Sequence, residues 1–117
     1  MARIKRTHMC GELSLNNLGE NVILTGWVQR RRDLGGLIFI QLRDRSGIIQ
    51  CTVNKDVTPD VFAEAFKVRS EFVLAVSGKV IKRDENAINE KMLTGYIEIA
   101  VSSLEILSKA ETTPIYI

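Results

Sequence analysis

The chain has 117 residues, of which 45% are hydrophobic, so it can form one domain whose core needs neither metal nor disulfides. Its net charge of +2 is too small to indicate a partner by itself. The apolar runs are far shorter than the roughly 20 residues of a membrane-spanning helix, and the basic N-terminus lacks the apolar stretch of a secretory signal. We therefore expect a single domain, residues 1–117, in the cytoplasm.

The first half of the sequence predicts three strands. Apolar and polar residues alternate over residues 22–32, 37–43 and 48–53, as in half-buried strands. The segment "DLGG" between the first two contains Gly35 and Gly36, which tolerate the positive φ of a hairpin turn. The segment "DRSG" predicts a second turn, which leads into the third strand.

A change of period at "TPDVFAEAFKVR" predicts a helix. Thr58 is a candidate N-cap, Pro59 suits the first helical position, and Asp60 suits the first turn. Three apolar residues fall on one face of this helix: Phe62, Ala65 and Phe66. We therefore expect the helix to cover an apolar opening.

Two more strands are predicted over residues 71–82 and 96–107, separated by a polar loop at residues 84–95. In the first of them, one apolar set alternates with another: Phe72, Leu74 and Val76 with Val73 and Ala75. Three strands, a helix and two strands are the order of the OB-fold, an all-β, five-stranded Greek-key barrel. We expect that fold, with the helix between strands 3 and 4 closing the bottom of the barrel.

The sequence contains no arrangement of residues that indicates catalysis. It has no phosphate loop, nucleophile elbow or zinc-protease motif, and its carboxylates are scattered. His8 has no Cys or carboxylate neighbour at ligand spacing, so we interpret it as a surface or packing residue. Cys10 and Cys51 are better interpreted as buried thiols than as a disulfide. We expect a binding domain with no catalytic, cofactor or metal site.

Phe39 is the first candidate binding residue. It alternates with Ile38 and Ile40, so we expect it on the outer face of strands two and three, where OB-folds bind oligonucleotides. An aromatic ring there can stack on an unpaired base. Gln50 should share this face, and its amide can both donate and accept. The alternative is that Phe39 packs under a loop or inside a twisted barrel.

Charged residues around Phe39 favour an anionic partner. Arg30, Arg31 and Arg32 can pair with phosphates or base edges, although an ordinary solvated strand end is the alternative. Three consecutive residues cannot all face one way, and a bulge in this strand would leave the choice open. Trp27 is ambiguous between outward and buried positions. Glu98 is either a plain outward residue or an acceptor for a base amino group.

Four segments carry a further pattern and cover nearly the whole chain: "RTHMCGEL", "GWVQRRRDLGGLIFIQLRDRSGIIQ", "VSGKVIKRDENAIN" and "TGYIEIAVSSLEILSKA". They resemble the N-terminal anticodon-binding domain of bacterial-type aspartyl-tRNA synthetases. The second segment is the most specific, because related lysyl and asparaginyl enzymes share only its looser scaffold. The chain departs from many relatives at Asn86 and Ala87, where they carry Lys-Asn.

The resemblance implies an OB-fold that grips the splayed GUC anticodon of aspartate tRNA. Phe39 would stack on the middle uridine, Gln50 would contact the same base, and Glu98 would help to read the outer bases. Arg30 and Arg32 correspond to arginines of that surface. The full set implied for RNA contact is Arg30, Arg32, Phe39, Gln50, Arg83 and Glu98.

The resemblance also implies a longer class II enzyme, which uses ATP and magnesium to ligate aspartate to tRNA. Its catalytic motifs do not occur here, and residues 109–117 resemble the start of a linker toward the catalytic domain. We expect a homodimeric parent and a monomeric fragment. Two other interpretations are a stand-alone single-stranded nucleic-acid-binding protein and a protein-interaction OB-fold module. The sequence leaves open whether the parent also charges asparagine tRNA.

Overall fold

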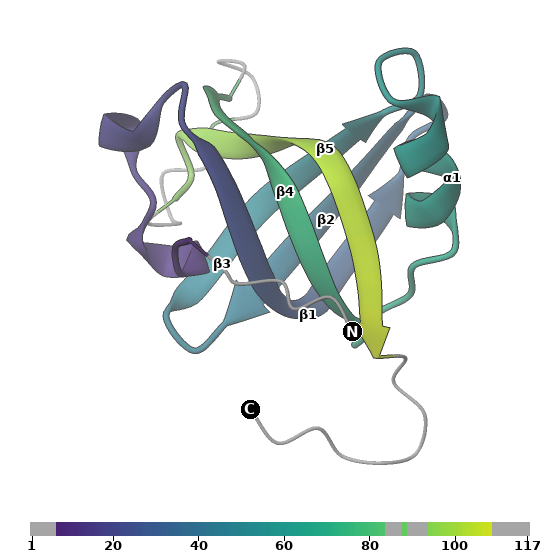
Figure 1. Cartoon of the computed structure of the whole chain (residues 1–117), viewed down its shortest axis with the longest axis horizontal. Coiled ribbons are helices and arrows are strands. Elements are labelled where there is room, and N and C mark those ends of the chain that lie inside the picture. Colours follow the sequence, from purple (N-terminus) through teal and green to yellow (C-terminus); the bar gives the residue numbers. More distant parts are fainter. Residues whose placement is uncertain (1–6, 84–87, 89–93, 109–117) are drawn as a thin grey trace.

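The structure is a computed structural model that describes residues 7–83, 88 and 94–108. Its elements, in chain order, are two short 3-10 helices, η1 (Cys10–Glu12) and η2 (Leu15–Asn17), and then β1 (Asn21–Asp33), β2 (Leu37–Asp44), β3 (Gly47–Asn54), α1 (Pro59–Phe66), β4 (Val73–Lys82) and β5 (Ile97–Ser108). The strands of this described part form a closed barrel in the order β1-β2-β3-β5-β4, with β1 pairing back onto β4 (Figure 1). The predicted OB-fold is confirmed.

The strand pairing places β5 between β3 and β4. It is antiparallel to β4 along most of its length, whereas its pairing with β3 is parallel and comprises Cys51↔Ile99 and Thr52↔Ala100. The hairpin between β1 and β2 turns at Gly35, whose φ of 76° is in the region that favours glycine. The second predicted turn lies between Asp44, the end of β2, and Gly47, the start of β3, so the sites of both predicted turns are correct.

The core follows the predicted alternation on the first three strands. The inward side chains are at most 1% exposed: Val22, Leu24, Val28, Ile38, Ile40, Leu42, Ile49, Cys51 and Val53. On β4 the alternation fails, because Ala75 is buried together with Leu74 and Val76. Ala75 pairs with Thr25 and Glu105, so its methyl group lies between two longer side chains.

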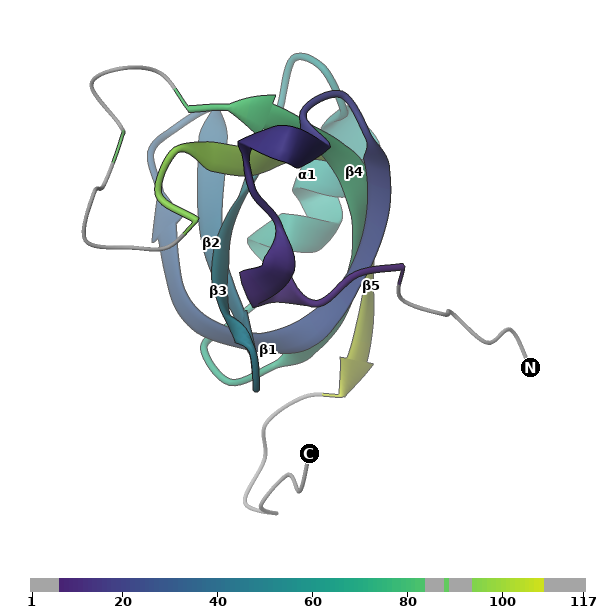
Figure 2. The same ribbon diagram turned by 90° about the vertical axis from the view of Figure 1, so that its left-hand side faces the viewer.

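The two ends of the barrel are covered by different segments, as the end-on view in Figure 2 shows: α1 lies behind the barrel, and the N-terminal turns cross in front. Ala65 of α1 is buried, and Cys10 and Leu13 are buried at the opposite end. The predicted burial of Phe66 is wrong, because its side chain is 54% exposed. The helix ends at Phe66, and beyond it Val68 is buried together with Ala65.

The start of α1 has the predicted residues but not the predicted hydrogen bond. Thr58 occupies the N-cap position and Pro59 the first helical position. The hydroxyl of Thr58 donates to the carbonyl oxygen of Asn54 at 3.4 Å, and the side chain caps no helical amide. Thr58 therefore joins the helix to the end of β3.

Asp44 ties the turn between β2 and β3 to the N-terminal segment. Its carboxylate accepts hydrogen bonds from the amides of Cys10 and Ser46, both at 2.8 Å, and the Ser46 hydroxyl accepts one from the amide of Gly11. A side chain at position 11 would collide with the Ser46 carbonyl, because a Cβ there would lie 2.2 Å from that oxygen. Burial raises the pKa of Asp44, but the hydrogen bonds outweigh it and hold the pKa below its ordinary value of 3.8.

We expect Asp44→Asn to lower the free energy of unfolding at pH 7 by about 1–3 kcal/mol, because its amide group faces N–H donors that need an acceptor. A depressed folded-state pKa means that the stabilisation is complete above pH 3.8 and is lost as the pH falls through the folded value. The gap between wild type and variant, measured by denaturant unfolding, should therefore close in acid. Asp56→Asn, at an exposed turn position, is the control. Equal stabilities at pH 7 would contradict the role of Asp44.

Candidate nucleic-acid interface

A β-bulge near the end of β1 determines which way the three consecutive arginines face. The pairing with β2 runs through Val28↔Leu42 and then shifts, so that Arg30 opposes Gln41 and Gln29 is the extra residue. Directly opposed residues on antiparallel strands share a face of the sheet. Arg30 is therefore on the outer face of the sheet, whereas strict alternation from the buried Val28 would have turned it inward.

Arg31 is turned the other way and binds the end of α1. It opposes the core residue Ile40, and its Nη2 donates to the carbonyl oxygen of Phe66 at 3.2 Å. Its guanidinium also lies 5.7 Å from the centre of the Phe66 ring and 3.6 Å from the Asp33 carboxylate. A cation at the last carbonyls of a helix is stabilising. Arg31 therefore holds the fold together, while its two neighbours stay exposed.

Six side chains form two rows across β1, β2 and β3, which we call the Phe39 face. The rows are Arg30, Gln41 and Gln50, and Arg32, Phe39 and Thr52. Phe39 is half-buried and stands on this outer face, as predicted, with Ile38 and Ile40 fully buried beneath the sheet. An aromatic ring flanked by a cation and by amides is suited to a base whose phosphate lies beside it.

Glu98 on β5 extends the Phe39 face across the seam between β3 and β5. Its Oε1 accepts a hydrogen bond from Nε2 of Gln50 at 3.0 Å, and Thr52 Oγ1 lies 3.5 Å from its Oε2. The negative charge of Glu98 also affects Cys51, which lies in the core on the other side of the sheet. Burial raises the pKa of the Cys51 thiol to about 12, and the charge of Glu98 acts in the same direction. The sequence prediction did not connect Glu98 with Gln50, because it needed the pairing of two distant strands.

Arg83 is close to Glu98 but is not on the surface. Its side chain is 5% exposed, and its Nε donates to the carbonyl oxygen of Ile97 at 2.9 Å. Burial lowers the pKa of Arg83, and the negative charge of Glu98 opposes that change. In the structure this side chain supports the start of β5. Its contact with RNA stays a prediction, as do the effects of Asn86 and Ala87, which lie outside the described residues.

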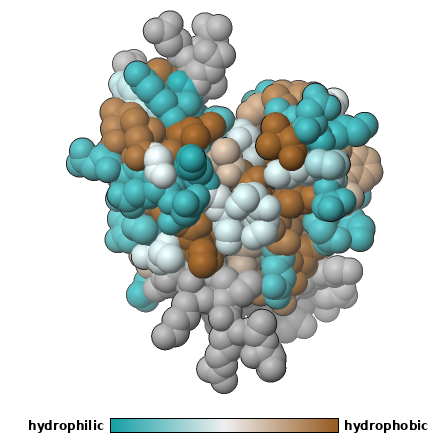
Figure 3. All heavy atoms as spheres, turned by 45° about the horizontal axis from the view of Figure 1, so that its top comes forward, coloured by the Kyte–Doolittle hydropathy of each residue, from teal (hydrophilic) through white to brown (hydrophobic). Residues whose placement is uncertain are grey.

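A hollow of about 400 Å³ opens beside Phe39, bounded by β2, β3, β5 and the segment that joins β3 to α1. Leu37 and Ala100 line it, with Thr52, Asn54 and Val57. Figure 3 turns the top of Figure 1 forward and shows a shallow channel of weakly polar residues between the side of the N-terminal helices and the side of α1. Sequence reasoning missed Gln41, Thr52 and this hollow; the alternation on β2 and β3 was the signal for the two residues.

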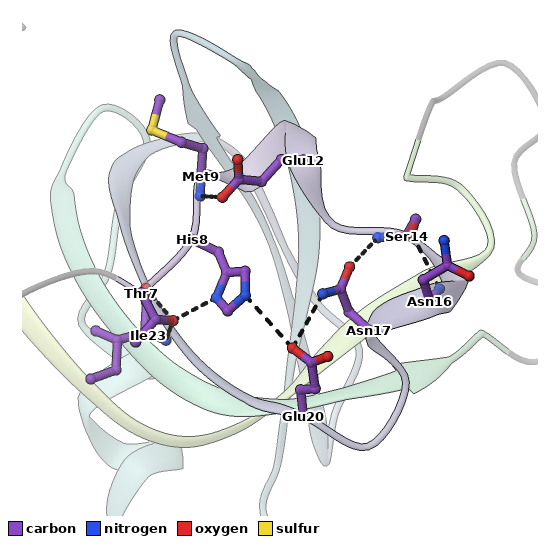
Figure 4. Close-up of polar contacts among 9 residues, drawn as sticks. All are labelled: Thr7, His8, Met9, Glu12, Ser14, Asn16, Asn17, Glu20 and Ile23. Carbon is purple, nitrogen blue, oxygen red and sulfur yellow. Dashed lines mark hydrogen bonds and ion pairs between the residues drawn. The ribbon is translucent and has the colours of Figure 1, made fainter.

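His8 belongs to a polar cluster at the N-terminus, shown in Figure 4. Its Nδ1 lies 2.7 Å from the Thr7 hydroxyl, and its Nε2 lies 3.6 Å from the carboxylate of Glu20. Thr7 is bound in turn to the backbone of Ile23 on β1. The cluster fastens the segment to the barrel, which agrees with a packing role for His8.

The cysteines and the acidic residues show no other chemistry in the part of the chain that the structure describes. Cys10 and Cys51 are free and buried, and burial raises the pKa of the Cys10 thiol. Within residues 7–83, 88 and 94–108, no group of His, Cys, Asp and Glu is arranged to hold a metal ion. The helices in those ranges include none that is long and apolar enough to cross a membrane.

Comparison with known proteins agrees with the fold. The model of the tRNA anticodon family, described as an OB-fold nucleic acid binding domain, matches residues 22–107. This chain belongs to that family. The matched range contains α1 and all five strands except the first residue of β1 and the last of β5, and therefore the whole Phe39 face.

Curated relatives of this chain include aspartate–tRNA ligases. It is 53% identical over 111 residues to the aspartate–tRNA(Asp/Asn) ligase of Thermoanaerobacter pseudethanolicus, covering 95% of this chain and 19% of that protein. It is 52% identical over 109 residues to the aspartate–tRNA ligase of Bacillus licheniformis, covering 93% of this chain and 18% of the relative. The chain thus spans about a fifth of the length of these relatives.

Solved structures share the fold of the anticodon-family domain. The asparaginyl-tRNA synthetase of Pyrococcus horikoshii, complexed with asparaginyl-adenylate, is similar with a TM-score of 0.76 and 31% identity, over 97% of this chain and 25% of that one. An OBody bound to hen egg-white lysozyme is similar with a TM-score of 0.81 and 27% identity, over 94% of this chain and all of the OBody.

Proposed function

We propose that the domain binds the anticodon loop of aspartate tRNA, as the N-terminal part of an aspartate–tRNA ligase. The observation that carries the proposal is the Phe39 face: an outward aromatic ring beside two exposed arginines, with Gln50 and Glu98 on the adjoining strands. The similarity to aspartate–tRNA ligases supports the choice of tRNA. Phe39 stacks on the middle uridine of the GUC anticodon, Gln50 reads its edge, and Arg30 and Arg32 neutralise phosphates.

The chemistry of the longer enzyme is part of the same proposal. The parent ligates aspartate to tRNA with ATP and magnesium in a class II catalytic domain, works in the cytoplasm and forms a homodimer. The domain itself contributes the grip on the anticodon and is monomeric. Residues 109–117 connect it to the rest of the parent.

The arginines give the proposal a quantitative test. We expect an RNA stem-loop with a GUC anticodon to bind more weakly as salt rises, with a slope of log K against log salt of about −0.7 for each phosphate contact. Arg30→Ala and Arg32→Ala should each make the slope shallower by about 0.7, because each removes one contact. Arg31→Ala should leave the slope unchanged and lower the melting temperature, because Arg31 binds α1.

Fluorescence titration at several salt concentrations, beside thermal unfolding, measures both effects. The Arg31 variant is the matched control for charge, since all three substitutions remove one cation. An affinity that does not depend on salt, or an equal loss of slope in all three variants, would contradict the assignment.

A protein partner is the second candidate, because an OB-fold of similar structure is bound to lysozyme in the OBody complex. In that case Arg30 and Arg32 would pair with acidic side chains. A competition experiment separates the two candidates. A GUC stem-loop should bind the domain, and an added acidic peptide should not displace the stem-loop from it.

A further inference from the structure

Gln50 has a fixed amide orientation because of its partner. An ionised carboxylate accepts hydrogen bonds and donates none, so the NH2 group of Gln50 must face Glu98, as the 3.0 Å contact between Nε2 and Oε1 shows. Glu98 uses one of the two N–H bonds of this amide, and so fixes the position of the acceptor Oε1. Gln50 can then present Oε1 and its remaining N–H to a ligand in one order only.

Glu98 is itself held in place. It lies beside the Thr52 hydroxyl and close enough to the buried guanidinium of Arg83 to oppose the effect of burial on that group. Gln41, the neighbour of Gln50 across the strand pair, is different: among the described residues its amide has no hydrogen-bond partner. The amide of Gln41 can turn over to suit either kind of base, whereas that of Gln50 cannot.

We propose that Glu98 is a positioning residue, which fixes the amide of Gln50 and so makes this side chain select a base with a donor at ring atom N3. Uridine carries N3–H, which matches the acceptor of Gln50. Cytidine carries a lone pair at N3, which opposes it. The inference rests on the proposed function and deepens it: discrimination at the base read by β3 depends on a carboxylate on β5.

The experiment compares Glu98→Gln with wild type on two RNA stem-loops, one with anticodon GUC and one with GCC. With an amide at position 98, the amide of Gln50 can turn and donate to N3 of cytidine. The ratio of the two affinities should fall about fivefold or more, largely because the GCC loop binds more tightly. Damage to the fold weakens both loops, so a gain for one loop is an effect that a merely structural role cannot produce.

The double variant Gln50→Glu with Glu98→Gln exchanges the two groups and keeps the total charge. The carboxylate now stands on β3 as an obligatory acceptor, and the amide on β5 donates to it, so the preference for the GUC loop should return. Glu105→Gln is the control: it removes the same charge from an exposed position of β5 opposite Ala75, and it should leave the ratio of affinities unchanged.

The outcomes separate this inference from the proposed function. If wild type prefers the GUC loop and Glu98→Gln keeps the full preference, the positioning role is wrong and the anticodon function stands. The same holds if the double variant fails to restore a preference that the single variant lost. If wild type binds neither loop, the proposed function fails and the positioning role with it.

Discussion

Ile40→Ala is expected to lower the free energy of unfolding by about 2–5 kcal/mol. Ile40 is fully buried at the centre of β2, where it opposes Arg31 on β1 and Cys51 on β3. Truncation removes buried apolar surface and leaves a cavity in a barrel whose strands cannot collapse independently. Denaturant unfolding measures the loss. Gln41→Ala, at the next position along the strand but on the opposite face, is the control and should change stability by less than about 0.5 kcal/mol.

Phe39→Ala should show the reverse pattern: a stability close to that of wild type, and a loss of about 1–3 kcal/mol in the binding of the GUC stem-loop. The ring lies outside the core, so its removal leaves no closed cavity, but it takes away the surface on which a base stacks. Phe66→Ala is the matched control, since Phe66 is an exposed aromatic residue on α1, away from the Phe39 face. Its affinity for the stem-loop should stay close to that of wild type.

Together the two substitutions test which way β2 faces. Should Phe39→Ala unfold the protein while Ile40→Ala has no effect, the faces of the strand are reversed and the stacking argument fails. Should Phe39→Ala change neither stability nor binding, the ligand uses another surface.

The strands and the barrel could be predicted because alternation is a local property of the chain. Ile38, Ile40 and Leu42 are each separated by one outward residue, and this pattern alone places Phe39 outside. The position of Gln50 followed in the same way. The fold could be identified from the order of its elements alone. The change of period at Thr58 placed the helix after the third strand in that order.

The features that could not be predicted from the sequence depend on contacts between residues far apart in the chain. The facing of Arg30 and Arg32 is set by one extra residue in β1, and a bulge leaves no mark on composition or period. Arg31 was indistinguishable from its neighbours until α1 brought the carbonyl of Phe66 next to it. In the same way, the burial of Arg83 and the bond between Gln50 and Glu98 arise only where β5 packs beside β3.

The insertion of β5 between β3 and β4 also has a consequence for the order of events during synthesis. β3 and β4 are not neighbours in the barrel, so each keeps an unpaired edge until β5 has left the ribosome. The segments that cover the two ends of the barrel do not have to wait for β5, because η1 and α1 both precede it in the chain. A chain that still lacks β5 therefore has two open strand edges and a core without Ile97, Ile99 and Val101, and the strand that carries Glu98 closes both edges at once.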